Sequence, residues 1–189
     1  MRYAETLALD IRPGLVSRVA AALENISGLG LWVTETGPLN RIMVLRFAES
    51  LEQLRDARQA LLAHVPRDVL VREEATSWRV VTPVLESGAY GSLYEWRCYE
   101  AHPDKMNGVV ELFNHALVAR ETLSPLCCAL VSLEGTPRFA HLWPYKDAQS
   151  RSTIRAEALK TGKWPPAIAP LLVRMENALL SPLPASAWY

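Results

Sequence analysis

The chain has 189 residues, of which half are hydrophobic and 21% are charged, with 20 acidic and 20 basic side chains. This balance provides no concentrated basic surface, so nucleic acid is excluded as an expected partner. No apolar run approaches the roughly 20 residues that span a bilayer, and the first residues lack the pattern of a signal peptide. We therefore expect a cytoplasmic protein that has no membrane partner.

The first half of the chain predicts four strands and two helices. Residues 2–9 alternate in polarity as a strand does, and Pro13-Gly14 leads into a helical stripe of apolar residues. Gly37-Pro38 separates two further apolar runs, which predicts a hairpin. Ser50 and Gln53 have the spacing of a capping box, so a second helix is expected to begin there, and a fourth strand follows it.

The second half repeats this order of elements. Residues 93–101 are strand-like, and Pro103-Asp104 leads into a second apolar helical stripe. A hairpin is predicted around Gly135, and Asp147 is a suitable N-cap for the helix that follows the returning strand. A fourth strand is predicted at residues 171–174, after a Trp-Pro-Pro stretch that begins at Trp164.

The order β-α-β-β-α-β occurs twice along the chain, which predicts an α+β fold of two ferredoxin-like units. We expect residues 1–82 to form the first unit, 83–92 to form a linker, and 93–189 to form the second unit with a C-terminal tail. The helices cover one face of each sheet, and the other face is too apolar to remain in water. The two units are therefore expected to pack sheet to sheet as a dimeric-α/β-barrel-like fold in one chain.

The three cysteines, Cys98, Cys127 and Cys128, indicate a reducing compartment and are expected to be buried thiols. Neighbouring cysteines on a strand point to opposite faces and rarely form a disulfide. Neither the cysteines nor the histidines have the spacing of metal ligands, and no glycine-rich phosphate loop is present. We expect no metal and no cofactor.

Four segments carry a family resemblance: Tyr94–Lys105, Gly30–Asn40, His141–Asp147 and Leu171–Pro184. They resemble the opening strand, the hairpin, the third strand and the closing strand of the NIPSNAP family, which belongs to the dimeric α/β-barrel superfamily. The resemblance implies a tandem repeat of that domain. The superfamily includes small-molecule oxygenases, haem-handling proteins and binding proteins, so what the resemblance implies about function is broad.

One strand of the second unit carries the candidate site. Strand alternation puts Glu95, Arg97 and Tyr99 on one face and Trp96 and Cys98 on the other. Because the helices are expected to cover the apolar set, the polar set is predicted to face the interior between the two sheets. His141 and Trp143 should join it there. The smaller residues aligned with this set in the first unit, and expected to leave room for a pocket, are Ala4, Thr6 and Ala8.

Two interpretations of this polar set remain open. Glu95 and Arg97 form either a structural ion pair, with Tyr99 and His141 as partners, or a site that contacts a ligand. The first functional hypothesis is a NIPSNAP-like protein that binds a small molecule or a protein partner through the barrel cleft or an outer edge, with self-association left open. The alternative is a cofactor-independent oxygenase or isomerase of a small aromatic or polyketide-like compound. In that alternative His141 is the catalytic base and Arg97 holds an anion or enolate.

Overall fold

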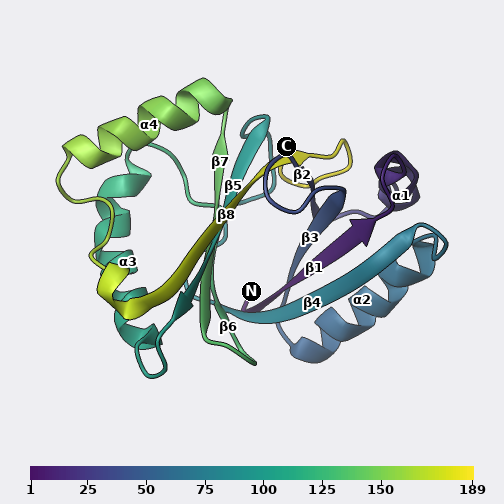
Figure 1. Cartoon of the computed structure of the whole chain (residues 1–189), viewed down its shortest axis with the longest axis horizontal. Coiled ribbons are helices and arrows are strands. Elements are labelled where there is room, and N and C mark those ends of the chain that lie inside the picture. The colour runs from purple at the N-terminus through teal and green to yellow at the C-terminus, as the bar shows by residue number, and fades with distance from the viewer.

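The computed structural model describes all 189 residues, and its elements follow the order β-α-β-β-α-β twice (Figure 1). The first unit contains β1 (Tyr3–Ile11), α1 (Val16–Leu23), β2 (Gly30–Thr34), β3 (Arg41–Ala48), α2 (Leu51–His64) and β4 (Leu70–Val80). The second contains β5 (Leu93–Ala101), α3 (Met106–Glu121), β6 (Cys128–Ser132), β7 (Arg138–Tyr145), α4 (Ala148–Lys160), the short 3-10 helix η1 (Ala169–Leu171) and β8 (Leu172–Pro182).

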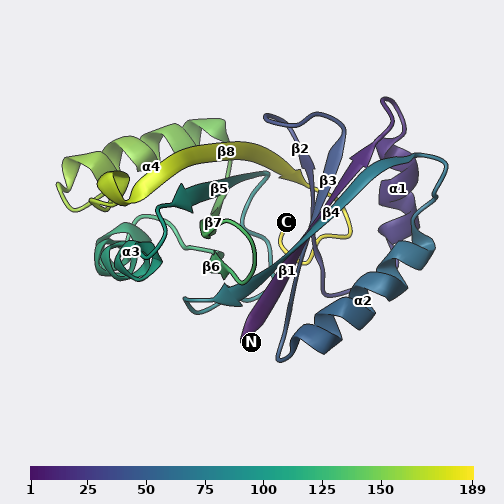
Figure 2. The same cartoon turned by 60° about the horizontal axis from the view of Figure 1, so that its bottom comes forward.

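All eight strands belong to one closed barrel, in the order β1-β3-β2-β8-β5-β7-β6-β4. Strand β2 pairs with β8, and β4 pairs with β6, so hydrogen bonds join the two units at both seams. Helices α1 and α2 lie on one outer side of the barrel, and α3 and α4 lie on the opposite side (Figures 1 and 2). The predicted α+β, dimeric-α/β-barrel-like fold is confirmed.

The second helix of each unit begins at a capping box. In α2 the Ser50 side chain accepts from the Gln53 amide, and in α4 Asp147 accepts from the Ser150 amide. In both boxes the side chain of the third helical residue also accepts a hydrogen bond from the backbone N–H of the N-cap residue. Each box thus satisfies two backbone N–H groups that have no partner within the helix. None of the helices is long and apolar enough to cross a membrane.

Strand pairing defines which residues of the two units are equivalent. Glu5 lies opposite Arg46 in the β1–β3 ladder, and Glu95 lies opposite Trp143 in the β5–β7 ladder. Glu5 is therefore the counterpart of Glu95. The sequence alignment that put Ala4 in that place is wrong by one residue, and a shift of one residue exchanges the two faces of a strand.

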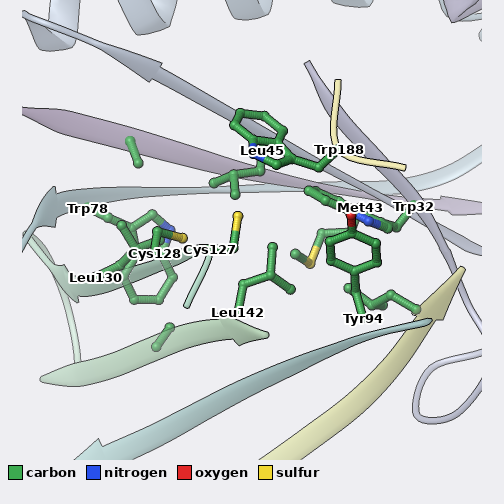
Figure 3. Close-up of a cluster of buried hydrophobic side chains, with 13 residues drawn as sticks. Trp32, Met43, Leu45, Trp78, Tyr94, Cys127, Cys128, Leu130, Leu142 and Trp188 are labelled. Carbon is green, nitrogen blue, oxygen red and sulfur yellow. The ribbon is translucent and has the colours of Figure 1, made fainter. Parts of the chain in front are cut away.

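The barrel interior is filled by apolar side chains of both units (Figure 3). Trp32 and Trp78 of the first unit and Tyr94 of the second belong to this buried cluster. Trp188, from the C-terminal tail, stacks near Trp32 with a centroid distance of 6.4 Å and donates to the Leu85 carbonyl at 3.1 Å. The tail therefore contributes to the core that the two units share.

The face assigned to the polar set is the main correction to the sequence analysis. Trp96 and Cys98 pack against the interior cluster, whereas Tyr99 and Trp143 belong to the cluster beneath α3. Glu95, Arg97, Tyr99, His141 and Trp143 therefore face helices α3 and α4 and not the space between the sheets. The expectation failed because both faces of a barrel strand are buried, so polarity alone does not identify the inner one.

Candidate functional site

A cavity of about 270 Å³ lies between the outer face of β5 and β7 and the helices α3 and α4. All five candidate residues, Glu95, Arg97, Tyr99, His141 and Trp143, line it. The sequence analysis thus brought together residues that share one cavity, although it placed them on the wrong side of the sheet. The small residues expected opposite them, Ala4, Thr6 and Ala8, belong to the barrel interior instead.

Two insertions make room for this cavity in the second unit. Helix α3 has 16 residues, whereas its counterpart α1 has 8. The connection between α4 and β8 contributes one wall, formed by Trp164, Pro165, Pro166 and Ile168. In the first unit the positions equivalent to Arg97, Tyr99 and His141 are apolar and buried in its helix-facing core, as Leu7, Leu9 and Val44.

Glu95 is fully buried and is surrounded by guanidinium groups. Arg151 of α4 donates to both carboxylate oxygens, at 2.7 and 3.1 Å, and Arg97 donates at 3.1 Å. Arg155, one helical turn after Arg151, approaches to 3.4 Å. Burial raises the pKa of Glu95, but the hydrogen bonds from Arg151 and the charges of the three arginines outweigh it and hold that pKa below its usual value. The carboxylate is therefore ionised and engaged.

Arg97 connects Glu95 to Tyr99. Its Nε donates to the Tyr99 hydroxyl oxygen, which leaves the hydroxyl proton of Tyr99 free to donate elsewhere. Burial lowers the pKa of Arg97, but the neighbouring Tyr99 and Glu95 raise it overall, so the guanidinium stays charged. Its side chain keeps 23% of its exposure and can therefore meet a ligand.

Arg120 of α3 is a buried cation with neutral partners. It donates to the Ser124 hydroxyl at 2.9 Å and to the Tyr145 hydroxyl at 3.2 Å, and its guanidinium carbon lies 4.3 Å from the centre of the Trp143 ring. Burial lowers the pKa of Arg120, yet an arginine remains charged near neutral pH. No carboxylate bonds to it, so its charge contributes directly to the potential inside the cavity.

His141 is neutral and offers a donor. Its Nδ1 accepts from the Trp143 indole N–H at 2.6 Å, which places the ring proton on Nε2. Burial, and then the charges of Arg97 and Arg120, lower the pKa of His141 well below its usual value. Phe113 packs against the imidazole with a centroid distance of 4.9 Å.

These bonds determine the chemistry that the cavity presents. The hydroxyls of Tyr99 and Tyr145 and the Nδ1 of His141 already accept bonds from neighbours, so each group retains a proton to donate. Glu95 is the one acidic residue among the lining side chains, and its carboxylate forms ion pairs with arginines. Aromatic rings of Phe113, Trp143 and Trp164 form the remaining walls. An anionic group attached to a flat apolar body complements this surface.

The sequence analysis missed four polar residues of this site: Arg120, Tyr145, Arg151 and Arg155. Tyr145 had a signal, because it follows His141 and Trp143 at alternate positions of one strand. Arg151 and Arg155 are four apart and so share one face of α4. No sequence signal pointed to Arg120, since an arginine near the end of a helix is ordinarily a solvated cation.

Comparisons with known proteins agree with this architecture. The chain is 26% identical over 161 residues to a NipSnap homologue of Dictyostelium discoideum, covering 80% of this chain and 71% of that protein. It is 28% identical over 170 residues to human NipSnap homologue 2, covering 86% of this chain but 57% of the human protein, so it spans little more than half of that relative. A candidate monooxygenase of Fusobacterium nucleatum matches the fold with a TM-score of 0.70 at 9% identity, over 96% of this chain and 92% of that one.

The family model named NIPSNAP matches residues 94–187, which include β5, α3, β6, β7, α4 and β8. This is the unit that contains the cavity and all five candidate residues. Through this unit, the chain belongs to the NIPSNAP family.

Proposed function

We propose that the cavity beneath α3 and α4 binds a small anionic molecule with a single aromatic or similarly flat ring. The observation that carries this proposal is the set of donors that the cavity presents, with its one carboxylate already engaged by arginines. A carboxylate, phenolate or enolate would accept from Arg97, Tyr99 and the His141 Nε2–H, whereas a cation would find no free acceptor among them.

Size and access support a ligand of one ring. The volume of about 270 Å³ is close to the lower end of the roughly 300–1,000 Å³ that is typical of small-molecule sites. His141 and Trp143 form a buried floor, while Leu159 and Met175 at the rim are 61% and 58% exposed. A solvent-accessible rim above a buried polar floor would let a ligand enter with its charged group first.

Thermal unfolding with benzoate tests this proposal. Ligand that binds only the folded state stabilises it, by about 2.7 kcal/mol at a concentration one hundred times Kd. We expect the melting temperature of the parent to rise with benzoate, and we expect Arg97→Met to lose most of that rise. Arg18→Gln is the control, because Arg18 is an exposed arginine of the first unit that pairs with Asp68 and does not line the cavity, so this variant should leave the rise intact. A parent that shows no rise at millimolar benzoate, or an Arg97→Met variant that responds fully, would contradict the proposal.

Catalysis in the same cavity is the second candidate. The observation in its favour is that Arg97 and His141, with its proton on Nε2, line one cavity with a buried floor, where donors can stabilise an enolate or another developing oxyanion. The Fusobacterium nucleatum protein of the same fold is a candidate monooxygenase, which is the kind of enzyme that this second candidate function describes. Because the Nδ1 of His141 is engaged by Trp143, the bond pattern favours a donor role for His141 over the role of base.

Oxygen uptake separates these two candidates. Parent protein incubated in air with a one-ring phenol such as resorcinol should consume oxygen if the cavity catalyses oxygenation, and Arg97→Met should then consume much less. Binding of benzoate without any oxygen uptake above that of a boiled sample would favour a binding protein.

We also infer that the first unit is a diverged copy of the NIPSNAP domain. The two NipSnap relatives align with 80% and 86% of this chain, which extends well beyond the second unit. Glu5 and Arg58 occupy the positions of Glu95 and Arg155, counted from paired strands and from the helix caps, and form an ion pair of 2.7 Å. On this account the first copy kept the structural ion pair and exchanged the ligand-facing residues for apolar ones.

A further inference from the structure

A second cavity, of about 810 Å³, opens at the end of the barrel where β1 and β5 finish. Unlike the cavity beneath α3 and α4, it is lined by strands of both units. Trp78 of β4 and Trp96 of β5 meet there with ring centroids 6.0 Å apart at 77°, so that they form an apolar corner. Small residues of β1, among them Ala8, leave the space beside this corner open.

The rim of this cavity is rich in arginines, and most of them have carboxylate partners. Arg41 binds Asp10 through two hydrogen bonds, of 2.6 and 2.9 Å. Arg72 pairs with Glu74 at 2.5 Å, and Arg174 pairs with Glu176. These three guanidinium groups are therefore neutralised by the protein itself.

Arg138 differs from its counterpart in the first unit. Arg41 lies opposite Asp10 in the β1–β3 ladder, and Arg138 lies opposite Glu100 in the β5–β7 ladder. Yet Arg138 donates to the neutral Thr76 hydroxyl, at 3.2 Å, and its guanidinium carbon lies 5.4 Å from the centre of the Trp78 ring.

The ε nitrogen of Arg138 is buried and has no hydrogen-bond partner. An N–H group that is removed from water without a partner is costly, and no carboxylate contacts this guanidinium, whose hydrogen bond goes to the neutral Thr76. The rest of this half-buried, charged group is therefore suited to receive an acceptor from the cavity. Arg41 and Asp10 form an ion pair in the first unit, whereas their counterparts Arg138 and Glu100 form none in the second. Arg138, which has no carboxylate partner, lies against the Trp78 ring at the apolar corner.

We propose that this barrel mouth is a second binding site, for an aromatic acid of two fused rings. The acidic group would bind Arg138 in place of the missing carboxylate partner. The ring system would lie against Trp78 and Trp96, where stacking and edge contacts favour flat apolar bodies. The larger volume accepts a two-ring acid, whereas the 270 Å³ cavity beneath α3 and α4 suits one ring. The two sites are independent, and either can exist without the other.

Calorimetric titration with 2-naphthoate tests this site. We expect saturable binding to the parent, and an affinity for Arg138→Gln that is about tenfold weaker or more, because a charge-assisted hydrogen bond is lost. Arg174→Gln is the matched control, since that rim arginine already has a carboxylate partner, and it should bind as the parent does. Absence of saturable binding to the parent, or equal affinities of the parent and Arg138→Gln, would overturn the proposal.

A second variant keeps the test valid if Arg138→Gln folds poorly. Ala8→Phe retains Arg138 but fills the open space from the opposite side of the barrel, with a residue that strands accept readily. We expect it to lose 2-naphthoate binding while benzoate still raises its melting temperature. Binding of 2-naphthoate by Ala8→Phe at parental affinity, or loss of that binding in Arg97→Met with Arg138→Gln unaffected, would assign the ligand to a place other than the barrel mouth.

Discussion

In the cavity beneath α3 and α4, Tyr99, Tyr145 and His141 each accept a hydrogen bond from a neighbouring residue of the protein. Each therefore faces a ligand with a proton that it can donate. Residue types alone do not reveal this, because a tyrosine or a neutral histidine can serve as donor or acceptor. The hydrogen bonds remove that ambiguity, and they are the basis of the proposed preference for anions.

The buried imidazole of His141 should make the stability of the fold depend on pH. Its pKa is lowered on folding, so below the unfolded value of about 6.5 the unfolded chain binds a proton that the folded chain does not. Stability is therefore present above that value and is lost as the pH falls. We expect this group to reduce the free energy of unfolding by about 1 kcal/mol between pH 7 and pH 5.5. Urea unfolding at the two pH values should show this loss in the parent and a smaller one in His141→Gln, whereas equal losses would contradict a neutral buried His141.

At the scale of elements, α4 depends on Glu95 more than on its own apolar face. Ala158 is its one buried residue, whereas α2 of the first unit buries three leucines. Arg151 and Arg155 bind α4 to the carboxylate of β5 from two successive turns. We therefore expect the ion pairs of Glu95 with Arg151 and Arg155 to be structural, and Arg97 to be the arginine that a ligand would contact.

Substitution of Glu95 and of Arg97 should accordingly have different effects. Glu95→Gln leaves three guanidinium groups without their anion, and we expect a loss of about 1–3 kcal/mol, moderated because all three arginines retain some exposure to water. Arg97→Met leaves Glu95 bound by Arg151, so we expect a loss below about 1 kcal/mol.

Hydrogen exchange identifies which element responds. Amides of α4 should exchange faster in Glu95→Gln, with α2 unchanged as an internal control. Exchange in α4 that stays at the parental rate, or a destabilisation by Arg97→Met as large as that by Glu95→Gln, would mean that the carboxylate does not hold the helix.

The element scale is also where sequence reasoning succeeded and then failed. Alternation along β5 correctly grouped Glu95, Arg97 and Tyr99 on one face, because the period of a strand is fixed by its backbone. It could not decide which face is covered by helices. The deciding contacts come from Arg151 and Arg155, which are distant in the chain and read locally as solvated charges.

At the scale of the whole molecule, the repeated order of elements was sufficient to predict the barrel, because each open sheet needs a partner of its own shape. Other features depend on dimensions that no motif encodes. The length of α3 and the wall formed by Trp164 and Pro165 decide that the second unit has a cavity under its helices. The contribution of the tail to the core was likewise not predictable from local pattern.

Trp188 should be important for the stability of both units together. It is 4% exposed, and it packs between Trp32 and Phe47 of the first unit, although it follows the last strand of the second. We expect Trp188→Ala to cost about 3–5 kcal/mol, in a single unfolding transition in urea. Tyr189→Ala is the control, since that side chain is 55% exposed and its loss should change stability by about 0.5 kcal/mol or less. Similar midpoints for the two variants would mean that the tail does not belong to the core.

The central claim is that the cavity beneath α3 and α4 selects for negative charge, and two ligands of nearly equal shape test it directly. Benzoate presents only acceptors to Arg97, Tyr99 and His141, whereas benzamide places an NH₂ group against the same donors. Isothermal titration of the parent protein at pH 7 should give a benzoate affinity at least about tenfold higher than that for benzamide. Equal affinities, or tighter binding of benzamide, would contradict a cavity built to hold an anion.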